Sequence, residues 1–153
     1  MKKPVTIARA LKEKNRVAGR LAKARQLVGK ENSKEKKIPR GVDVTAVYAE
    51  AKSLRNRLVD IKTAIAVANQ PIVGKIIELD EVKSEIAYLN GLDVQEGVFE
   101  EASYGNKVVK EYDAVIRKAD VLAEVEALQR RADELQDELD EFNASTKVEI
   151  EVD

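Results

Sequence analysis

The sequence of 153 residues contains no histidine, no cysteine and no tryptophan, and aromatic side chains make up only 4% of it. Without histidine and cysteine the chain has no disulfides, no thiol chemistry, no zinc ligands of these types and no imidazole base for a catalytic triad. With only two Phe residues, the core must be built from Leu, Ile, Val and Ala on amphipathic helices. We therefore expect a non-enzymatic protein without a cofactor.

Long apolar runs are also missing. No segment approaches the roughly 20 apolar residues that a membrane-spanning helix needs, and no signal-peptide core follows Met1. The Gly-rich motifs GxGxxG and GxxxxGK, which bind phosphate groups, do not occur either. These absences predict a soluble, cytoplasmic protein that does not contact a membrane.

Charge is plentiful, at 36% of all residues, but it is divided between the two ends of the chain. Residues 1–40 hold 14 Lys/Arg and 3 Asp/Glu, for a net charge of +11, whereas residues 120–153 hold 12 Asp/Glu and 3 Lys/Arg, for a net charge of −9. Six of these acids lie within the nine residues 133–141. We expect them to pair with the basic N-terminal segment, in the same chain or in a second copy.

The clearest pattern is an alternation of apolar residues three and four positions apart. One run comprises Val44, Val47, Ala51, Leu54, Leu58, Ile61, Ile65 and Ala68, and another comprises Val121, Val125, Leu128, Ala132, Leu135, Leu139 and Phe142. This spacing is typical of the a/d seam of a coiled coil or a close-packed bundle. It predicts long helices over about 44–69 and 120–143, with Asp43 and Asp120 at their starts.

Two further helices are predicted over about 5–32 and 75–90. The first has an apolar face at Ile7, Leu11, Ala18, Leu21 and Val28, and a basic stripe at Arg9, Lys12, Arg16, Arg20 and Lys23. The other places Ile76, Leu79, Val82, Ile86 and Leu89 on its inward face, and Gly91 would stop it. Pro71 either kinks or breaks the chain before this helix, and we favour a break.

Strands are expected near residues 107–116 and 147–152, with a Gly-containing loop over 91–106. The two strands would pair with each other or with those of a symmetry mate. Asn69 and Asn143 are each followed by β-branched residues, which indicates a weak internal repeat of helix, Asn stop and extended exit. Asn suits such a stop because it tolerates the left-handed conformation that closes many helices.

Several segments resemble a small family of uncharacterised bacterial helical proteins, some of which carry the label septicolysin. The resemblance lies in TIARALKEKNRVAGRLAKARQLV, KTAIAVAN, IVGKIIELDEVKSEIAYLNGLDVQEG, YDAVI and LQDELDEFNASTKVEI. It implies a mostly helical bacterial protein of unknown activity and no catalytic residue. The label implies a toxin, whereas these helices are highly charged and have no lipid-facing apolar surface.

Two other functions have specific residues in their favour. Five cations on one helix face are typical of a protein that lies along a nucleic-acid backbone, although aromatic residues for base stacking are missing from that helix. Glu78, Glu81 and Glu85 share a face of the third helix, where an all-oxygen Mg²⁺, Ca²⁺ or Mn²⁺ site is an alternative to a solvated face; we expect no metal.

The sequence therefore predicts a mainly all-α protein of one domain, 1–153, in which long antiparallel helices form a bundle or coiled coil with a small β element. Because seams of this length are hard to bury with so few aromatic residues, we expect a homo-oligomer that serves as a structural or protein-interaction module. The seam that we expect to mediate contact has four residues facing four others: Leu54, Leu58, Ile61 and Ile65 against Leu128, Leu135, Leu139 and Phe142.

Overall fold

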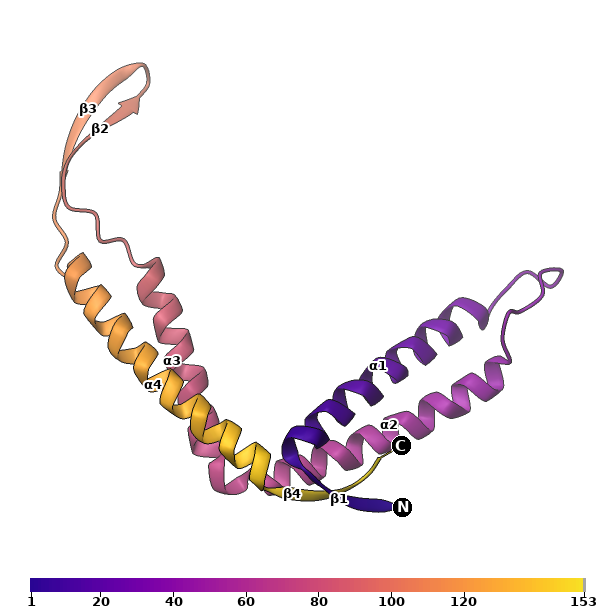
Figure 1. Cartoon of the computed structure of the whole chain (residues 1–153). Helices are drawn as coiled ribbons and strands as arrows, with labels where there is room; N and C mark the ends of the chain where they lie inside the picture. The colour runs from indigo at the N-terminus through magenta and orange to yellow at the C-terminus, as the bar shows by residue number, and fades with distance from the viewer. Residues whose placement is uncertain (153) are drawn as a thin grey trace. The chain divides into compact units, whose positions relative to one another are not determined.

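The computed structural model describes residues 1–152 and shows a mainly helical chain (Figure 1). Over these residues there are four α-helices: α1 (Ile7–Glu31), α2 (Val44–Ala68), α3 (Val73–Gly91) and α4 (Lys118–Ser145). Four strands form two small antiparallel sheets: β1 (Lys2–Thr6) pairs with β4 (Lys147–Glu151), and β2 (Gly97–Ser103) pairs with β3 (Asn106–Tyr112). The predicted helical class is confirmed, and each helix begins and ends within about two residues of its expected position.

Residue contacts divide the chain into two compact units, whereas the sequence analysis treated it as one domain. Unit 1 combines Met1–Val73 with the described residues from Asp140 onward, and unit 2 is Gly74–Leu139. Unit 1 therefore contains α1, α2 and the β1–β4 sheet, and unit 2 contains most of α3 and α4 together with the β2–β3 hairpin.

The core of unit 1 lies between α1, α2 and the β1–β4 sheet. Its most buried side chains include Ile7 and Val17 of α1, Ile61 of α2 and Ile150 of β4. Both helices are capped at their N-termini as their sequences favour: the Thr6 hydroxyl accepts a hydrogen bond from Arg9 N, and Asp43 Oδ1 accepts one from Ala46 N. The cap predicted at Asp43 is confirmed.

The N-terminal segment differs from the prediction. Residues 2–6 form strand β1, where a helix beginning near residue 5 was expected, because Thr6 is the extended N-cap residue and the helix starts after it. Pro4 also favours an extended conformation in Lys3 before it. The strand predicted over 147–152 is present as β4, Lys147–Glu151, but its partner is β1, with Val5 opposite Val148, and not the strand near 107–116.

The connection from α2 to α3 is a break, as we favoured. Pro71 lies in a single 3-10 turn, Gln70–Ile72, between the two helices. Of the two predicted Asn stops, Asn69 is confirmed as the residue that ends α2, although its angles are right-handed, φ −79° and ψ −7°. The stop at Asn143 is wrong, because this residue lies inside α4. The extended exit after α4 begins instead at Lys147, where β4 pairs with β1.

The segment 91–106, expected as loop, contains strand β2, so the strand expected over 107–116 is one half of a hairpin. The two strands are joined by Tyr104 and Gly105, which both have positive φ, 47° and 84°. Two such residues form the tight turn whose twist suits an antiparallel hairpin. Gly105 was the sequence signal for this turn, but the alternation in VFEEAS is too irregular to indicate a strand by itself.

In unit 2, α3 and α4 are linked by their side chains. Arg131 donates two hydrogen bonds to Glu78, with Nε to Oε1 at 2.7 Å and Nη2 to Oε2 at 3.0 Å, and Lys75 forms an ion pair with Glu138. Arg117 N donates to Asp120 Oδ2 at the start of α4, so Asp120 caps that helix from within its first turn. All five residues predicted on the inward face of α3 are buried or half-buried.

Candidate interaction surfaces

The seam of α2 is used inside unit 1. Leu54, Ile61 and Ile65 are buried, and Leu58 is half-buried against the same cluster. The other members of this cluster come from α1, β1 and β4, and Phe142 packs on it. The predicted periodicity is therefore real, but the structure covers it with α1 and the β1–β4 sheet, where the sequence analysis placed α4.

The seam of α4 follows its predicted positions as well. Leu135 and Leu139 are buried and Leu128 is half-buried, all within unit 2. The prediction placed four α2 residues opposite four α4 residues. Of the four α4 residues, Phe142 packs against the cluster that contains Leu54, Ile61 and Ile65, and Leu58 of α2 packs against the same cluster.

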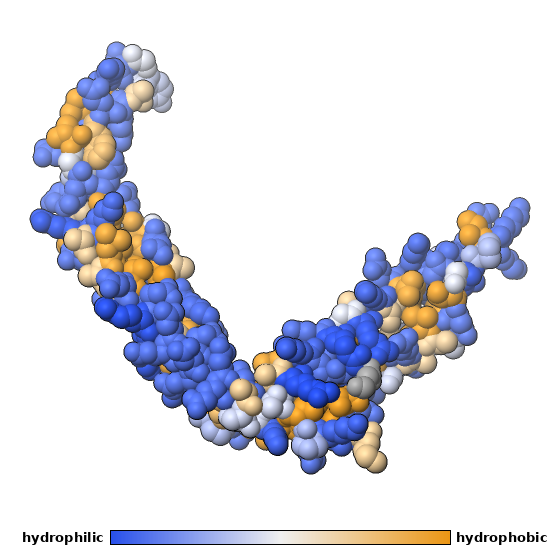
Figure 2. Space-filling view, in the orientation of Figure 1, coloured by the Kyte–Doolittle hydropathy of each residue, from blue (hydrophilic) through white to orange (hydrophobic). Residues whose placement is uncertain are grey.

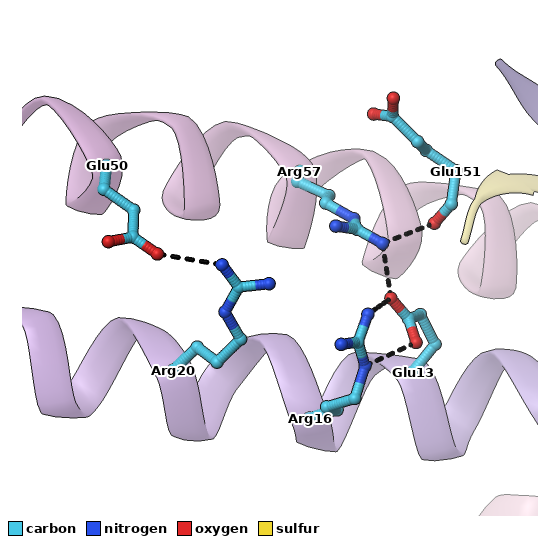
Figure 3. Close-up of polar contacts among 6 residues, drawn as sticks. All are labelled: Glu13, Arg16, Arg20, Glu50, Arg57 and Glu151. Atoms are coloured by element: carbon cyan, nitrogen blue, oxygen red, sulfur yellow. Dashed lines mark hydrogen bonds and ion pairs between the residues drawn. The ribbon is translucent and has the colours of Figure 1, made fainter. Parts of the chain in front are cut away.

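The basic stripe lies at the surface of α1, and all five of its cations are exposed. Figure 3 shows two of them, Arg16 and Arg20, with their partners. Arg16 donates to both carboxylate oxygens of Glu13, at 2.9 and 2.7 Å, and Arg20 Nη2 pairs with Glu50 Oε1 of α2 at 2.8 Å. Among residues 1–152, no ion pair involves the remaining three cations, Arg9, Lys12 and Lys23. These three side chains leave positive charge on one face of the helix.

A polar cluster that sequence reasoning missed joins three elements of unit 1. Arg57 of α2 donates from Nη2 to Glu13 of α1 and to the Glu151 main-chain oxygen of β4, the second bond being 3.1 Å long (Figure 3). The Arg57 and Glu13 side chains are only 14% and 11% exposed. Because each charge has an opposite partner and the cluster contains no nucleophile, the arrangement joins elements and offers no obvious chemistry.

A hollow of about 380 Å³ lies beside this cluster, and Arg20, Glu50, Asn56, Arg57 and Asp60 are among its lining residues. Its lining combines cations with carboxylates, so it presents no single charge for which a ligand would be selected.

The loop from α1 to α2 is organised by a buried carboxylate. Glu31 accepts hydrogen bonds from Lys34 and from Gly41 N, and these contacts lower its pKa from the ordinary value of 4.5. Arg40 adds a bond from Nε to the Glu31 carbonyl oxygen at 3.0 Å. The loop therefore closes on the last turn of α1.

Three of the six acids in residues 133–141 have partners within unit 2. Glu134 pairs with Arg131, Glu138 pairs with Lys75, and Asp133 accepts from Gln129 Nε2 at 3.0 Å. These partners lie on α3 and on α4 itself, whereas we expected pairing with the basic helix α1.

The three glutamates proposed as a metal site are not used together. Arg131 forms a bidentate ion pair with Glu78 and so lowers the pKa of the Glu78 carboxyl. Within the described residues, no group of three or more His, Cys, Asp and Glu side chains is placed to hold a metal ion. Nor does any described helix combine the length and the apolar composition required to cross a membrane.

The hairpin carries a polar and aromatic cluster on one face. Glu101 of β2 accepts a hydrogen bond from the Tyr112 hydroxyl at 2.6 Å and pairs with Lys110, both on β3. These contacts lower the pKa of Glu101 and raise those of Lys110 and Tyr112. Phe99 packs edge-on against Tyr112, with ring centroids 5.9 Å apart.

Comparison of the chain with models of protein families, with curated proteins and with solved structures found no match. The resemblance to the helical bacterial family therefore stays a prediction, and the function must be argued from the surfaces described above.

Proposed function

We propose that this protein is a non-enzymatic structural or protein-interaction module that assembles with copies of itself through its helices, as a helical bundle. One observation carries the proposal: α3 has apolar side chains on two opposite faces. Its inward face is covered, but Ile77 and Tyr88 are 57% and 59% exposed. At 100° per residue, these two side chains lie about 20° apart and about 160–180° from Leu79 on the inward face, with Leu89 at the edge of that face about 100–120° away.

A helix with two apolar faces is stable when both are covered. The α3–α4 pair covers one face only, and other apolar side chains of unit 2 are exposed as well, at Leu122, Val98 and Val109. Figure 2 shows apolar surface among the hydrophilic residues of the chain. We infer that these exposed side chains contribute apolar area to a contact with another protein molecule.

The test is the mass in solution. We expect size-exclusion chromatography with light scattering to give a discrete multiple of the chain mass, 17.0 kDa. The double variant Ile77→Ser with Tyr88→Ser should dissociate at higher protein concentrations than the natural chain does. A matched control is Tyr48→Ser with Val59→Ser on α2, since these side chains are 55% and 56% exposed. A natural chain that is monomeric at every concentration would disprove the proposal.

A second candidate function, binding along a nucleic-acid backbone, is favoured by the three stripe cations that make no ion pair within residues 1–152: Arg9, Lys12 and Lys23. Replacing all three with Gln should then weaken binding to a labelled DNA or RNA duplex and flatten its salt dependence, because each phosphate contact contributes a slope of about −0.9. Lys62, Lys83 and Lys118, all exposed and outside the stripe, provide a matched control triple. No binding at low salt would rule this function out.

A further inference from the structure

The β2–β3 hairpin presents a strand edge whose charges complement themselves. Its sheet contains two strands, so over residues 1–152 neither outer edge is paired with another strand. A two-stranded hairpin is marginally stable in water and gains stability when more strands are added. An unpaired edge carries backbone donors and acceptors that a further strand can bind.

The turn determines which groups face outward. Ser103 and Asn106 close the two-residue turn and are therefore a hydrogen-bonded pair. Since hydrogen-bonded and non-hydrogen-bonded pairs alternate along an antiparallel ladder, the backbone groups of Lys107, Val109 and Glu111 point to the outer edge of β3. Val109 is also 62% exposed.

We propose that β3 pairs in antiparallel fashion with β3 of a second copy, with Val109 on the twofold axis between them. This inference rests on the proposed self-assembly and names one contact that produces it. In this arrangement Val109 faces Val109 of the second copy. Lys107 lies opposite Glu111 of the second copy, and Glu111 lies opposite Lys107 of the second copy. All three outward residues are then paired, two opposite-charge pairs form, and the hairpins make one sheet of four strands.

Other symmetric pairings of the hairpin edges are less favourable. Centring β3 on Lys107 or on Glu111 places like charges opposite each other. Centring it on Val108 leaves Lys107 and Glu111 without an oppositely charged residue facing them, and centring it on Lys110 places Lys110 opposite Lys110 of the second copy. On β2 the outward residues are Val98, Glu100 and Ala102, so full overlap would place Glu100 against Glu100. A lysine on an edge strand normally discourages foreign strands, whereas here it has a partner in a copy of the same chain.

Charge exchange tests the register. Lys107→Glu alone or Glu111→Lys alone turns both inter-copy pairs into repulsions and should raise the dissociation constant of the dimer contact roughly tenfold. The double variant restores opposite charges and should restore assembly. Lys107 also pairs with Glu100 inside the hairpin at 3.4 Å, so Glu100→Gln, which removes only that contact, is the control and should leave the mass unchanged.

A disulfide provides a second measurement that does not depend on weakening the contact. The chain contains no cysteine, so Val109→Cys introduces its only thiol. Directly opposed residues of a hydrogen-bonded antiparallel pair have Cα atoms about 5.5 Å apart, within the range that a disulfide spans. Ala102→Cys, on the same face but on β2, is the control, because three strand spacings, roughly 14 Å, would separate its copies.

Val109→Cys should form covalent dimers under mild oxidation far faster than Ala102→Cys. Equal rates, or single charge variants that assemble like the natural chain, would overturn the β3 pairing while leaving self-assembly through α3 standing. Masses that still grow without limit in the Ile77→Ser with Tyr88→Ser variant, in which the α3 contact is weakened, would indicate open pairing of β3 with β2 of the next copy, and would also overturn it. A natural chain that stays monomeric would overturn both proposals together.

Discussion

At the scale of single residues, charged side chains hold together the turns and hairpins that apolar burial does not reach. Glu31 is the clearest case, since it is buried at the end of α1 and receives bonds from Lys34 and Gly41. Its charge fixes a loop that has little apolar surface, and Arg57 plays a comparable part between α1, α2 and β4.

Replacing Glu31 with Gln should lower the melting temperature by a few degrees, because the shape is kept but the charge that Lys34 contacts is lost. Circular dichroism at 222 nm would follow the transition. Glu35→Gln, an exposed acid of the same loop, is the control and should melt like the natural chain. If both variants melt at the natural temperature, the carboxylate does not stabilise this loop.

Acid should loosen the hairpin. The pKa of Glu101 is lowered from 4.5 by Lys110 and Tyr112, so its stabilising contribution is complete above about pH 4.5 and disappears as the pH falls through the lowered value. Hydrogen exchange of the β2 and β3 amides, corrected for intrinsic rates, should therefore show less protection near pH 3 than at pH 6. In Glu101→Gln this difference should shrink, and an equal difference in both proteins would contradict the assignment.

At the scale of elements, the buried seams should determine stability. Ile61 is 1% exposed in the core of unit 1, so Ile61→Ala should lower the free energy of unfolding by about 2–5 kcal/mol. Val59→Ala, two residues away on the exposed side of α2, should change it by no more than about 0.5 kcal/mol. Urea unfolding measures both, and equal effects would mean that the α2 seam is not the buried face.

The seams were predictable because apolar residues that alternate three and four positions apart over three heptads all lie on one face of a helix. All positions of the α2 run, Val44 to Ala68, and of the α4 run, Val121 to Phe142, are buried or half-buried in the structure. What covers each seam was not predictable, since periodicity identifies a face and not its partner. The α2 seam packs against α1 and β4, where the pattern suggested α4.

The strands were harder to predict than the helices. Strand β1 has only five residues, one of them Pro4, and it exists because β4 lies beside it, with Val5 opposite Val148. Strand β2 depends on the turn at Tyr104 and Gly105, where a non-glycine residue adopts positive φ. Tertiary pairing decided both strands, and local sequence preference carries little of that information.

At the scale of the whole molecule, the net charge of −1 conceals two oppositely charged ends of the chain, whose charged side chains lie mostly at the surface while apolar residues form the cores. The basic end contributes an exposed stripe on α1, and two of the acids near the other end, Glu134 and Glu138, form ion pairs within α3 and α4. Neither group of charges is needed to fill a core. Exposed apolar side chains occur in both units, at Tyr48, Val59 and Val67 of α2 as well as at Ile77 and Tyr88 of α3, and we propose that those of α3 make the contact with another molecule.

The two units should behave as separate units of stability. Leu135 is fully buried in unit 2 and does not belong to the cluster that contains Ile61. At one fixed protein concentration, the losses from Ile61→Ala and Leu135→Ala should therefore add to within about 0.5 kcal/mol in the double variant. Hydrogen exchange should speed up mainly in α1, α2 and β4 for the first variant and in α3 and α4 for the second. A large coupling energy, or faster exchange throughout the chain from either change, would instead support the single cooperative domain that the sequence suggested.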